Sequence, residues 1–301
     1  MIKKVFMVNT PDYPTRGTHY LMTDKFINGF ALNGLEIGQV NSFEQVEDSE
    51  ENMFVMCDNF YDFRKSNWKE EFEYLAQKFE KTTWVFWTFH NVLPHFDVFP
   101  FKNCHFTGEY YRRPDFSILG QNFKKYLELG NYINLPFAAN VHPNDVDKYI
   151  SRREEVYDAA FVGCAYKQDW VEQLRTKFNC FVHFSPPFIS DEDRLNHGFL
   201  RTRICLGFNA DDNIKNGLPT ERIFEGLAYG CVVLTDCKMA EEATNGIAVY
   251  VEDYQDLEKK VDFYTKNQSA REEKQRLGVE YAKNKGTYFH VAKDFLDKIT
   301  N

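Results

Sequence analysis

The sequence lacks a long apolar run and an excess of positive charge, and each absence excludes a class of protein. No stretch approaches an uninterrupted apolar length of about 18 residues, which a membrane-spanning helix needs. The opening MIKKVFMVNT is followed by Pro11 and Asp12, which leaves too short an apolar run for a signal peptide. The net charge of −9 disfavours nucleic acid and anionic membranes, because both need a basic field. We therefore expect neither as a partner, and no transmembrane segment.

The chain also lacks any C-x-x-C pair, although it contains seven cysteines. An odd number of cysteines without close pairs indicates reduced thiols, as in a cytoplasmic protein. The same pattern argues against a zinc site.

What is present is ample material for two hydrophobic cores. The 301 residues are 43% hydrophobic and 17% aromatic, with 29 Phe and 17 Tyr, so we expect an ordered chain. This length accommodates two domains of about 150 residues each.

Candidate strands and helices alternate along the chain. In the first half we expect strands at KKVFMVN, LEIGQV, NMFVMCD and TTWVFWTF, and helices at YLMTDKFINGFALNG and SNWKEEFEYLAQKF. After a connector around 140–150 we expect strands at DAAFVGCAY, CFVHFS, ICLGFN, CVVLTD and GIAVYV, helices at KQDWVEQLRTKF, near 191–203 and within GLPTERIFEGLAYG, and two terminal helices. This rhythm predicts an α/β protein with two facing, Rossmann-like, doubly wound parallel-sheet domains, 1–143 and 144–301. Ligands of such sheets bind at the carboxyl ends of the strands.

The helix within GLPTERIFEGLAYG concentrates charge next to a buried strand. Thr220 is the expected N-cap, and the free N–H groups and dipole of the first turn favour an anion. Arg222 adds a planar fork suited to a phosphate, and Glu225 can accept hydrogen bonds from two vicinal hydroxyls, as on a ribose. Gly226, on the same face, leaves a gap that something can approach. The alternative is a solvated face with an Arg222–Glu225 ion pair.

This helix resembles the nucleotide-binding helix of GT-B glycosyltransferases, closest to spore-coat-maturation-type members with an R-x-F-E-x-x-A-x-G pattern. The matching residues are Arg222, Phe224, Glu225, Ala228 and Gly230. The resemblance implies that Glu225 holds the ribose of a donor nucleotide, and we count Thr220, Glu221 and Arg222 with the donor-binding residues. It also implies a nucleotide-sugar-binding domain at 144–301 and an acceptor-side domain at 1–143, on which the last helix can pack back.

The stretch TWVFWTFHNVLPH, residues 83–95, places a histidine-bearing turn directly after an expected strand. It resembles the T-x-H-N-x-x-P-H turn of family 4 glycosyltransferases, which implies that His90 faces the donor sugar and its phosphate. His19, near the start of an earlier helix, is a candidate acceptor-side base. Each histidine has a structural alternative, as a packing residue or as a helix-start residue.

Two glycines and a lysine complete the candidate donor site. Gly17 lies in the loop after the first strand, where GT-B enzymes bring a glycine-containing loop to the diphosphate. Gly163 and Lys167 fit, loosely, the strand-end glycine and the basic residue that reach the pyrophosphate in this fold family. A single glycine is a weak signal, and Lys167 is alternatively an ordinary first-turn lysine.

The segment SDEDRL contains a D-x-D, Asp191 and Asp193, of the kind that holds Mn²⁺ or Mg²⁺ in other transferases. Acidic residues at a helix start are expected from the dipole alone, so we interpret this segment as a cap. We predict no metal site and no cofactor, the nucleotide sugar being a substrate.

Two features leave the family assignment open. Family 4 enzymes carry a second glutamate eight residues before the ribose-binding one, and the corresponding residue here is Gly217. The stretch LGFNADDNIKNGLPTERIFEGLAYG also resembles the donor-binding stretch of α-1,3-fucosyltransferases. The histidine turn and the C-terminal KGTYFHVAKDFLDKI favour family 4.

The sequence thus predicts a hexosyltransferase-type glycosyltransferase that moves a sugar from a UDP- or GDP-linked donor to a glycan or other acceptor. Helix dipole and basic side chains replace a metal in this prediction, and net retention of configuration is implied by the family 4 resemblance. Three alternatives remain: an inverting α-1,3-fucosyltransferase-like GDP-sugar enzyme, a catalytically silent coat or scaffold protein, and a sugar-nucleotide epimerase. The donor sugar, the acceptor and the oligomeric state stay open.

Overall fold

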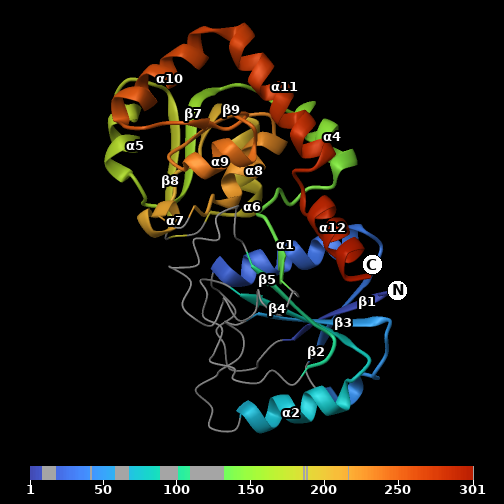
Figure 1. Ribbon diagram of the computed structural model, residues 1–301. Helices are drawn as coiled ribbons and strands as arrows, with labels where there is room; N and C mark the ends of the chain where they lie inside the picture. Colours follow the sequence, from blue (N-terminus) through green and yellow to red (C-terminus); the bar gives the residue numbers. More distant parts are fainter. Residues whose placement is uncertain are drawn as a thin grey trace. The chain divides into compact units, whose positions relative to one another are not determined.

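The computed structural model describes residues 1–8, 18–40, 43–57, 68–88, 101–108, 132–185, 187, 189–215 and 217–300. They form two compact units, shown in Figure 1: Met1–Pro136 together with Tyr288–Asn301, and Phe137–Thr287. Each unit is a parallel sheet flanked by helices, which confirms the predicted α/β fold with two doubly wound domains. The functional division at 143/144 stays a prediction. No helix in the described part of the chain has the length and apolarity to cross a membrane.

In the first unit, six described strands form one parallel sheet in the order β2-β1-β3-β4-β5-β6. The strands are β1 (Lys4–Val8), β2 (Glu36–Val40), β3 (Asn52–Cys57), β4 (Thr83–Thr88), β5 (Cys104–Gly108) and β6 (Tyr132–Asn134). The helices are α1 (Thr18–Leu32), the one-turn η1 (Phe43–Gln45), α2 (Trp68–Lys78) and α12 (Tyr288–Thr300). Central strands such as NMFVMC are continuous apolar runs because helices cover both faces of a parallel sheet.

Aromatic side chains dominate the core between α2 and this sheet. Phe79, just after α2, lies edge-on to Phe54 of β3, with ring centroids 5.0 Å apart. Phe54 in turn contacts Trp84 of β4 at 4.7 Å. These large buried rings account for the high aromatic content of the first half of the chain.

The last helix of the chain, α12, packs on α1 and so belongs to the first unit. The ring of Phe295 contacts those of Phe26 and Phe30 at centroid distances of 6.0 and 6.1 Å. The Asn33 side chain donates a hydrogen bond to the Phe289 carbonyl at 2.8 Å. Gly29 lets the helices approach closely, because a Cβ there would collide with the Tyr288 carbonyl.

The second unit has a five-stranded parallel sheet in the order β11-β10-β9-β7-β8, counting the described strands. The strands are β7 (Tyr157–Cys164), β8 (Cys180–Ser185), β9 (Thr202–Leu206), β10 (Val232–Thr235) and β11 (Val249–Tyr250). The helices are η2 (Pro143–Asp145), α4 (Val146–Ile150), α5 (Gln168–Arg175), α6 (Asp191–Asp193), the π-helix η3 (Arg194–Leu200), α7 (Asp211–Lys215), α8 (Glu221–Ala228), α9 (Lys238–Ala243), α10 (Tyr254–Lys266) and α11 (Gln268–Asn284). Figure 1 shows α10 and α11 as two successive helices at this unit's surface.

The structure differs from the sequence expectation in several elements. The strands β5 and β6 and the helices α7 and α9 were not predicted, and the expected connector around 140–150 contains η2 and α4. Three helices, not two, end the chain, because α10 passes directly into α11 at Asn267. That residue ends one helix and caps the next, its side chain accepting a hydrogen bond from the Ala270 amide at 3.1 Å.

Candidate functional site

The sheet of the second unit has a topological switch point between β7 and β9. After β7 the chain crosses to β8 on one side and then returns to β9 on the other. Doubly wound sheets bind ligands beyond the carboxyl ends of two such strands. Gly163 lies near the carboxyl end of β7, and Phe208 follows β9. The amino end of α8 lies at this same edge, because a helix that joins parallel strands runs antiparallel to them.

Arg222, in the first turn of α8, lies at the switch point. Its Nη1 donates a hydrogen bond to the Phe208 carbonyl at 3.1 Å, and its guanidinium lies 4.8 Å from the ring centroid of Phe161 on β7. A Cβ on Gly163 would collide with the guanidinium. Burial lowers the pKa of Arg222, and the neighbouring charge of Arg194 acts in the same direction. The side chain is partly buried and, within the described residues, forms no ion pair with a carboxylate.

Thr220 and Glu221 begin the helix. Thr220 occupies the N-cap position with an extended backbone, but its side chain makes no capping hydrogen bond. Its Oγ1 is buried and has no hydrogen-bond partner among the described residues. Glu221 is 9% exposed, and its carboxylate helps to raise the pKa of Arg194. The first turn of α8 therefore keeps donor groups that its own cap does not use.

The helix is buried on two sides, which corrects the interpretation of its glycine. A Cβ on Gly226 would meet Val233 of β10 at 2.8 Å and Cys205 of β9 at 3.0 Å, so the glycine admits the sheet and not a ligand. On the other side, Leu227 packs against Gly278 of α11. These two contacts occupy the sides of α8 that carry Gly226 and Leu227.

Glu225 forms an ion pair with Arg194, the first residue of η3, through Oε2 and Nη2. The side chains are 8% and 23% exposed, so the solvated face considered from the sequence is wrong. Burial disfavours the charged Arg194, but the carboxylates of Glu225, Glu221 and Asp191 outweigh it and raise the pKa of Arg194. The guanidinium also lies 5.7 Å from the ring centroid of Phe199. Sequence reasoning did not identify Arg194, whose partner is 31 residues away.

Lys167 follows β7 and stands at the N-cap position of α5 with a left-handed backbone, φ 51°. Its Nζ lies 3.3 Å from Asp211 Oδ1, and 5.4 Å from the ring centroid of Trp170. The Asp211 side chain is 78% exposed, so this ion pair is a weak surface contact. The charge of Lys167 also acts to lower the pKa of the buried Asp236, which stands at the carboxyl end of β10.

Asp236 and Asn209 form a buried polar pair at the same edge, which sequence reasoning also missed. Asp236 Oδ1 accepts hydrogen bonds from the Asn209 amide at 3.0 Å and from its side chain at 2.9 Å. Burial raises the pKa of Asp236, while the Asn209 hydrogen bonds and the charge of Lys167 oppose this. Position at the end of a buried strand was the available signal for both residues.

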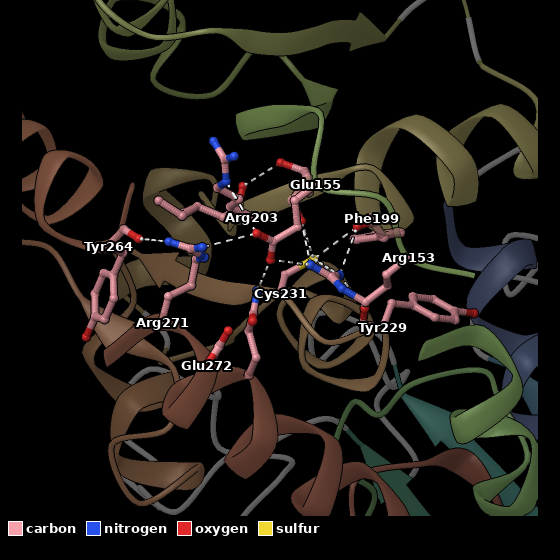
Figure 2. A network of polar contacts seen from close by, with 12 residues as sticks. Arg153, Glu155, Phe199, Arg203, Tyr229, Cys231, Tyr264, Arg271 and Glu272 are labelled. Atoms are coloured by element: carbon pink, nitrogen blue, oxygen red, sulfur yellow. Dashed lines mark hydrogen bonds and ion pairs between the residues drawn. The ribbon is translucent and has the colours of Figure 1, made fainter. Parts of the chain in front are cut away.

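A polar network at the opposite end of α8 anchors the helix (Figure 2). Arg153 Nη1 donates to the Tyr229 carbonyl at 2.6 Å, directly after α8, and to the Phe199 carbonyl at 3.2 Å, at the end of η3. Glu155 lies between three arginines, pairing with Arg203 and Arg271 at 3.3 Å each and with Arg153 at 3.5 Å. A cation at the carboxyl end of a helix is favourable, and it fixes α8 and η3 together.

Three further predicted residues, Gly17, His19 and His90, belong to the first half of the chain. Gly17 and His90 lie outside the described residues. His19 lies in α1, where the structure describes the backbone and not its side chain. In SDEDRL, Ser190 Oγ accepts a hydrogen bond from the Asp193 amide at 3.0 Å and donates to Asp193 Oδ2 at 2.7 Å, which is the predicted cap. The roles of all the predicted site residues stay predictions.

Comparisons with known proteins agree with the fold. Residues 153–297 match the sequence model of the family described as "Glycosyl transferase-like". No curated protein matches the sequence. T4 phage β-glucosyltransferase is similar with a TM-score of 0.56 at 13% identity, over 99% of this chain and 100% of that one. It has also been solved in complex with UDP and Mn²⁺.

Two further solved structures are similar over their length. A glycosyltransferase from Rickettsia africae ESF-5 has a TM-score of 0.53 at 11% identity, over 99% of this chain and 98% of that one. An E. coli trehalose-6-phosphate protein bound with UDP-2-fluoro glucose has a TM-score of 0.55 at 10% identity, over 99% of each chain. At these identities the likeness shows a shared fold.

Proposed function

We propose that the chain is a GT-B-fold glycosyltransferase that moves a sugar from a nucleoside-diphosphate sugar to an acceptor, because residues 153–297 match the glycosyl transferase-like family and the fold is that of T4 phage β-glucosyltransferase. One observation carries the choice of donor. The amino end of α8 brings Arg222 and a Thr220 hydroxyl without a described partner to the switch point of the sheet. Cationic and N–H donor groups at this position suit a diphosphate.

Arg222 and the first turn of α8 bind the diphosphate in this proposal. Among the described residues, the guanidinium contacts a carbonyl and an aromatic ring and forms no ion pair with a carboxylate. A buried charge without a counter-ion is costly, and a diphosphate supplies the missing negative charge. Thr220 Oγ1 and the first amides of α8 add hydrogen bonds. Sugar transfer releases a nucleoside diphosphate, so the same groups stabilise the leaving group.

Lys167 is the second cation of the proposed diphosphate site. Its Nζ is 3.3 Å from an exposed carboxylate, that of Asp211. Exchange of this surface contact for a phosphate costs little, because exposed ion pairs contribute only about 0–1 kcal/mol. Gly163, near the end of β7, contributes by leaving room for Arg222.

Glu225 binds the ribose in this proposal, as the family resemblance implies. Its carboxylate is nearly buried one turn inside α8, where the geometry of an acceptor is well fixed. Glu221, at the first position of α8, is adjacent to Thr220 and Arg222 and contributes a second hydrogen-bond acceptor to the proposed donor site. The remaining proposed residues are His90, facing the donor sugar, His19 as the acceptor-side base, and Gly17 at the diphosphate.

We propose a UDP-linked sugar as the first donor to test and a GDP-linked sugar as the second. The T4 phage and E. coli proteins of similar fold were solved with UDP and with UDP-2-fluoro glucose. We propose transfer without a metal, since the described groups at the site include two cations, and with retention of configuration, which the family 4 resemblance implies. Product NMR in the presence of EDTA tests both properties.

A reducing, cytoplasmic location is also proposed. The cysteines that the structure describes are free, and three of them, Cys205, Cys231 and Cys237, are buried in the second unit with pKa values raised by burial. Buried thiols of this kind are inert packing groups, which suit a compartment where thiols stay reduced.

The test is calorimetric titration with UDP, GDP, ADP and CMP in EDTA, followed by assay of donor hydrolysis and transfer. Saturable binding of one nucleoside diphosphate in EDTA is expected. Absence of binding to all four nucleotides, with or without Mn²⁺, would overturn the proposed function and favour the alternative of a catalytically silent coat or scaffold protein with the GT-B fold. Binding that EDTA abolishes and Mn²⁺ restores would overturn metal independence alone, and would return Asp191 and Asp193 to consideration.

A further inference from the structure

The proposed ribose-binding residue, Glu225, is held by an arginine from a different part of the chain. Arg194 Nη2 contacts Glu225 Oε2, and the pair joins the first residue of η3 to the middle of α8. No other residue type offers such a fork with a permanent charge. The pair lies close to Arg222, whose pKa responds to both residues.

A carboxylate that binds ribose must be ionised and must point in a fixed direction. Burial of Glu225, 8% exposed, opposes ionisation, and an adjacent guanidinium compensates for the lost hydration. A carboxylate has about four lone-pair directions, so the contact with Arg194 does not by itself use its full acceptor capacity. Holding the acceptor in advance lowers the entropic cost of binding.

Arg194 is itself fixed in place. Its amide donates to the Ser190 carbonyl at 2.9 Å, and its guanidinium lies 5.7 Å from the ring centroid of Phe199. It begins a seven-residue π-helix, a rare conformation that is frequent at functional sites. Arg153 holds the far end of this π-helix and of α8 together, as Figure 2 shows. The position of Arg194 relative to Glu225 is therefore set at both ends of η3.

We infer that Arg194 is a positioning residue for ribose recognition: it holds the Glu225 carboxylate ionised and directed at the 2′- and 3′-hydroxyls of the donor nucleotide. This inference rests on the proposed function. It assigns Arg194 no contact with the diphosphate, so its loss weakens recognition of the ribose and spares recognition of the phosphates.

The test compares UDP with 2′-deoxy-UDP and 3′-deoxy-UDP by calorimetry, or the corresponding GDP series if the nucleotide screen selects GDP. Wild type, Arg194→Gln, Arg194→Lys, Glu225→Gln and the double variant are titrated, and melting curves are recorded. Wild type is expected to prefer the ribonucleotide by at least about tenfold. Arg194→Gln should reduce this preference towards that of Glu225→Gln, and Arg194→Lys should restore part of it. The double variant, Arg194→Gln with Glu225→Gln, leaves neither charge of the pair without its partner. It should prefer the ribonucleotide over the deoxynucleotides at least as strongly as Glu225→Gln does.

Arg276→Gln is the matched control, because Arg276 forms an exposed ion pair with Glu280 on α11. It should leave the preference for the ribonucleotide unchanged. An equal loss of affinity for all three nucleotides in Arg194→Gln would make Arg194 a phosphate ligand and overturn the inference. A lower melting temperature with the ribose preference intact would reduce the pair to a structural one. Failure of wild type to bind any nucleotide would instead overturn the proposed function, and the inference with it.

Discussion

The guanidinium of Arg222 occupies the space that a side chain on Gly163 would need. Gly163 lies near the end of β7 and Arg222 lies in the first turn of α8. These two residues, 59 positions apart in sequence, are therefore in contact at the switch point. Gly163 was predicted as the strand-end glycine that precedes the basic residue of a pyrophosphate site. Its observed effect is to admit the cation that we propose binds that diphosphate, so the two residues act as a unit.

Gly163→Ala should therefore displace Arg222 and weaken both folding and nucleotide binding. A methyl group in a filled site costs typically about 1–3 kcal/mol of unfolding free energy. Nucleoside diphosphate affinity should fall further than this destabilisation explains, because the guanidinium moves. Denaturant unfolding and calorimetry on the same sample check the prediction. Unchanged affinity in a folded variant would separate the glycine from the anion site.

Arg222→Met should retain the fold and lose the ligand. The substitution removes a hydrogen bond of about 1 kcal/mol and also relieves the desolvation of a buried charge, so the two effects on stability oppose each other. The unfolding free energy should change by no more than about 1 kcal/mol, while affinity for the nucleoside diphosphate falls at least about tenfold. Arg175→Met, at an exposed ion pair on α5, is the control and should bind normally. A large loss of stability without a loss of affinity would make Arg222 a structural residue.

Asp236→Asn should gain stability relative to wild type as the pH rises. Burial raises the pKa of Asp236 above its ordinary 3.8, so the folded state holds the proton more tightly than the unfolded chain does. Wild type therefore loses stability from about pH 3.8 upwards, through the folded pKa. Asparagine keeps the Oδ1 acceptor for Asn209 and has no proton to lose. Urea unfolding should show that the free energy of unfolding of the variant, relative to that of wild type, is higher at about pH 7 than at about pH 4. A flat or opposite trend in this difference would contradict the prediction.

His90→Ala should reduce turnover far more than it weakens binding of the free nucleoside diphosphate. The family resemblance sets this histidine beside the transferring sugar, whereas the free diphosphate lacks that sugar. Steady-state kinetics and calorimetry measure the two effects separately. If affinity for the diphosphate collapsed while turnover per bound donor stayed normal, the histidine would belong to the nucleotide site.

Local sequence was sufficient for α8 and for the alternation of strands and helices. Thr220 at the N-cap and the apolar spacing from Ile223 onwards are properties of neighbouring residues, so they are visible without a structure. The resemblance to a donor-binding helix depends on the same short stretch. The β5 and β6 strands were not predicted, because CHFTG and YIN are short and mix polar with apolar residues.

Contacts over long sequence separations were not predictable in this way. Glu225 has a closer charged neighbour in sequence, Arg222, but the fold turns Arg222 towards β7 and β9 and brings Arg194 to the carboxylate. Asn209 and Asp236 are 27 residues apart and meet only because their strands are adjacent in the sheet. Spacing along one helix therefore selected Arg222 and Glu225 as candidates, whose roles stay predictions, and it suggested the wrong ion-pair partner for Glu225.

The most direct measurement is isothermal titration of Glu225→Ala with the nucleoside diphosphate that wild type binds, in EDTA, beside a melting curve. A carboxylate that accepts ribose hydroxyls makes charge-assisted bonds of about 1.5–3 kcal/mol each, so affinity should fall at least about tenfold while the protein remains folded. Removing the carboxylate also leaves Arg194 without this partner, so some loss of melting temperature is expected. Unchanged affinity in the folded variant would mean that α8 holds the protein together and does not hold a nucleotide.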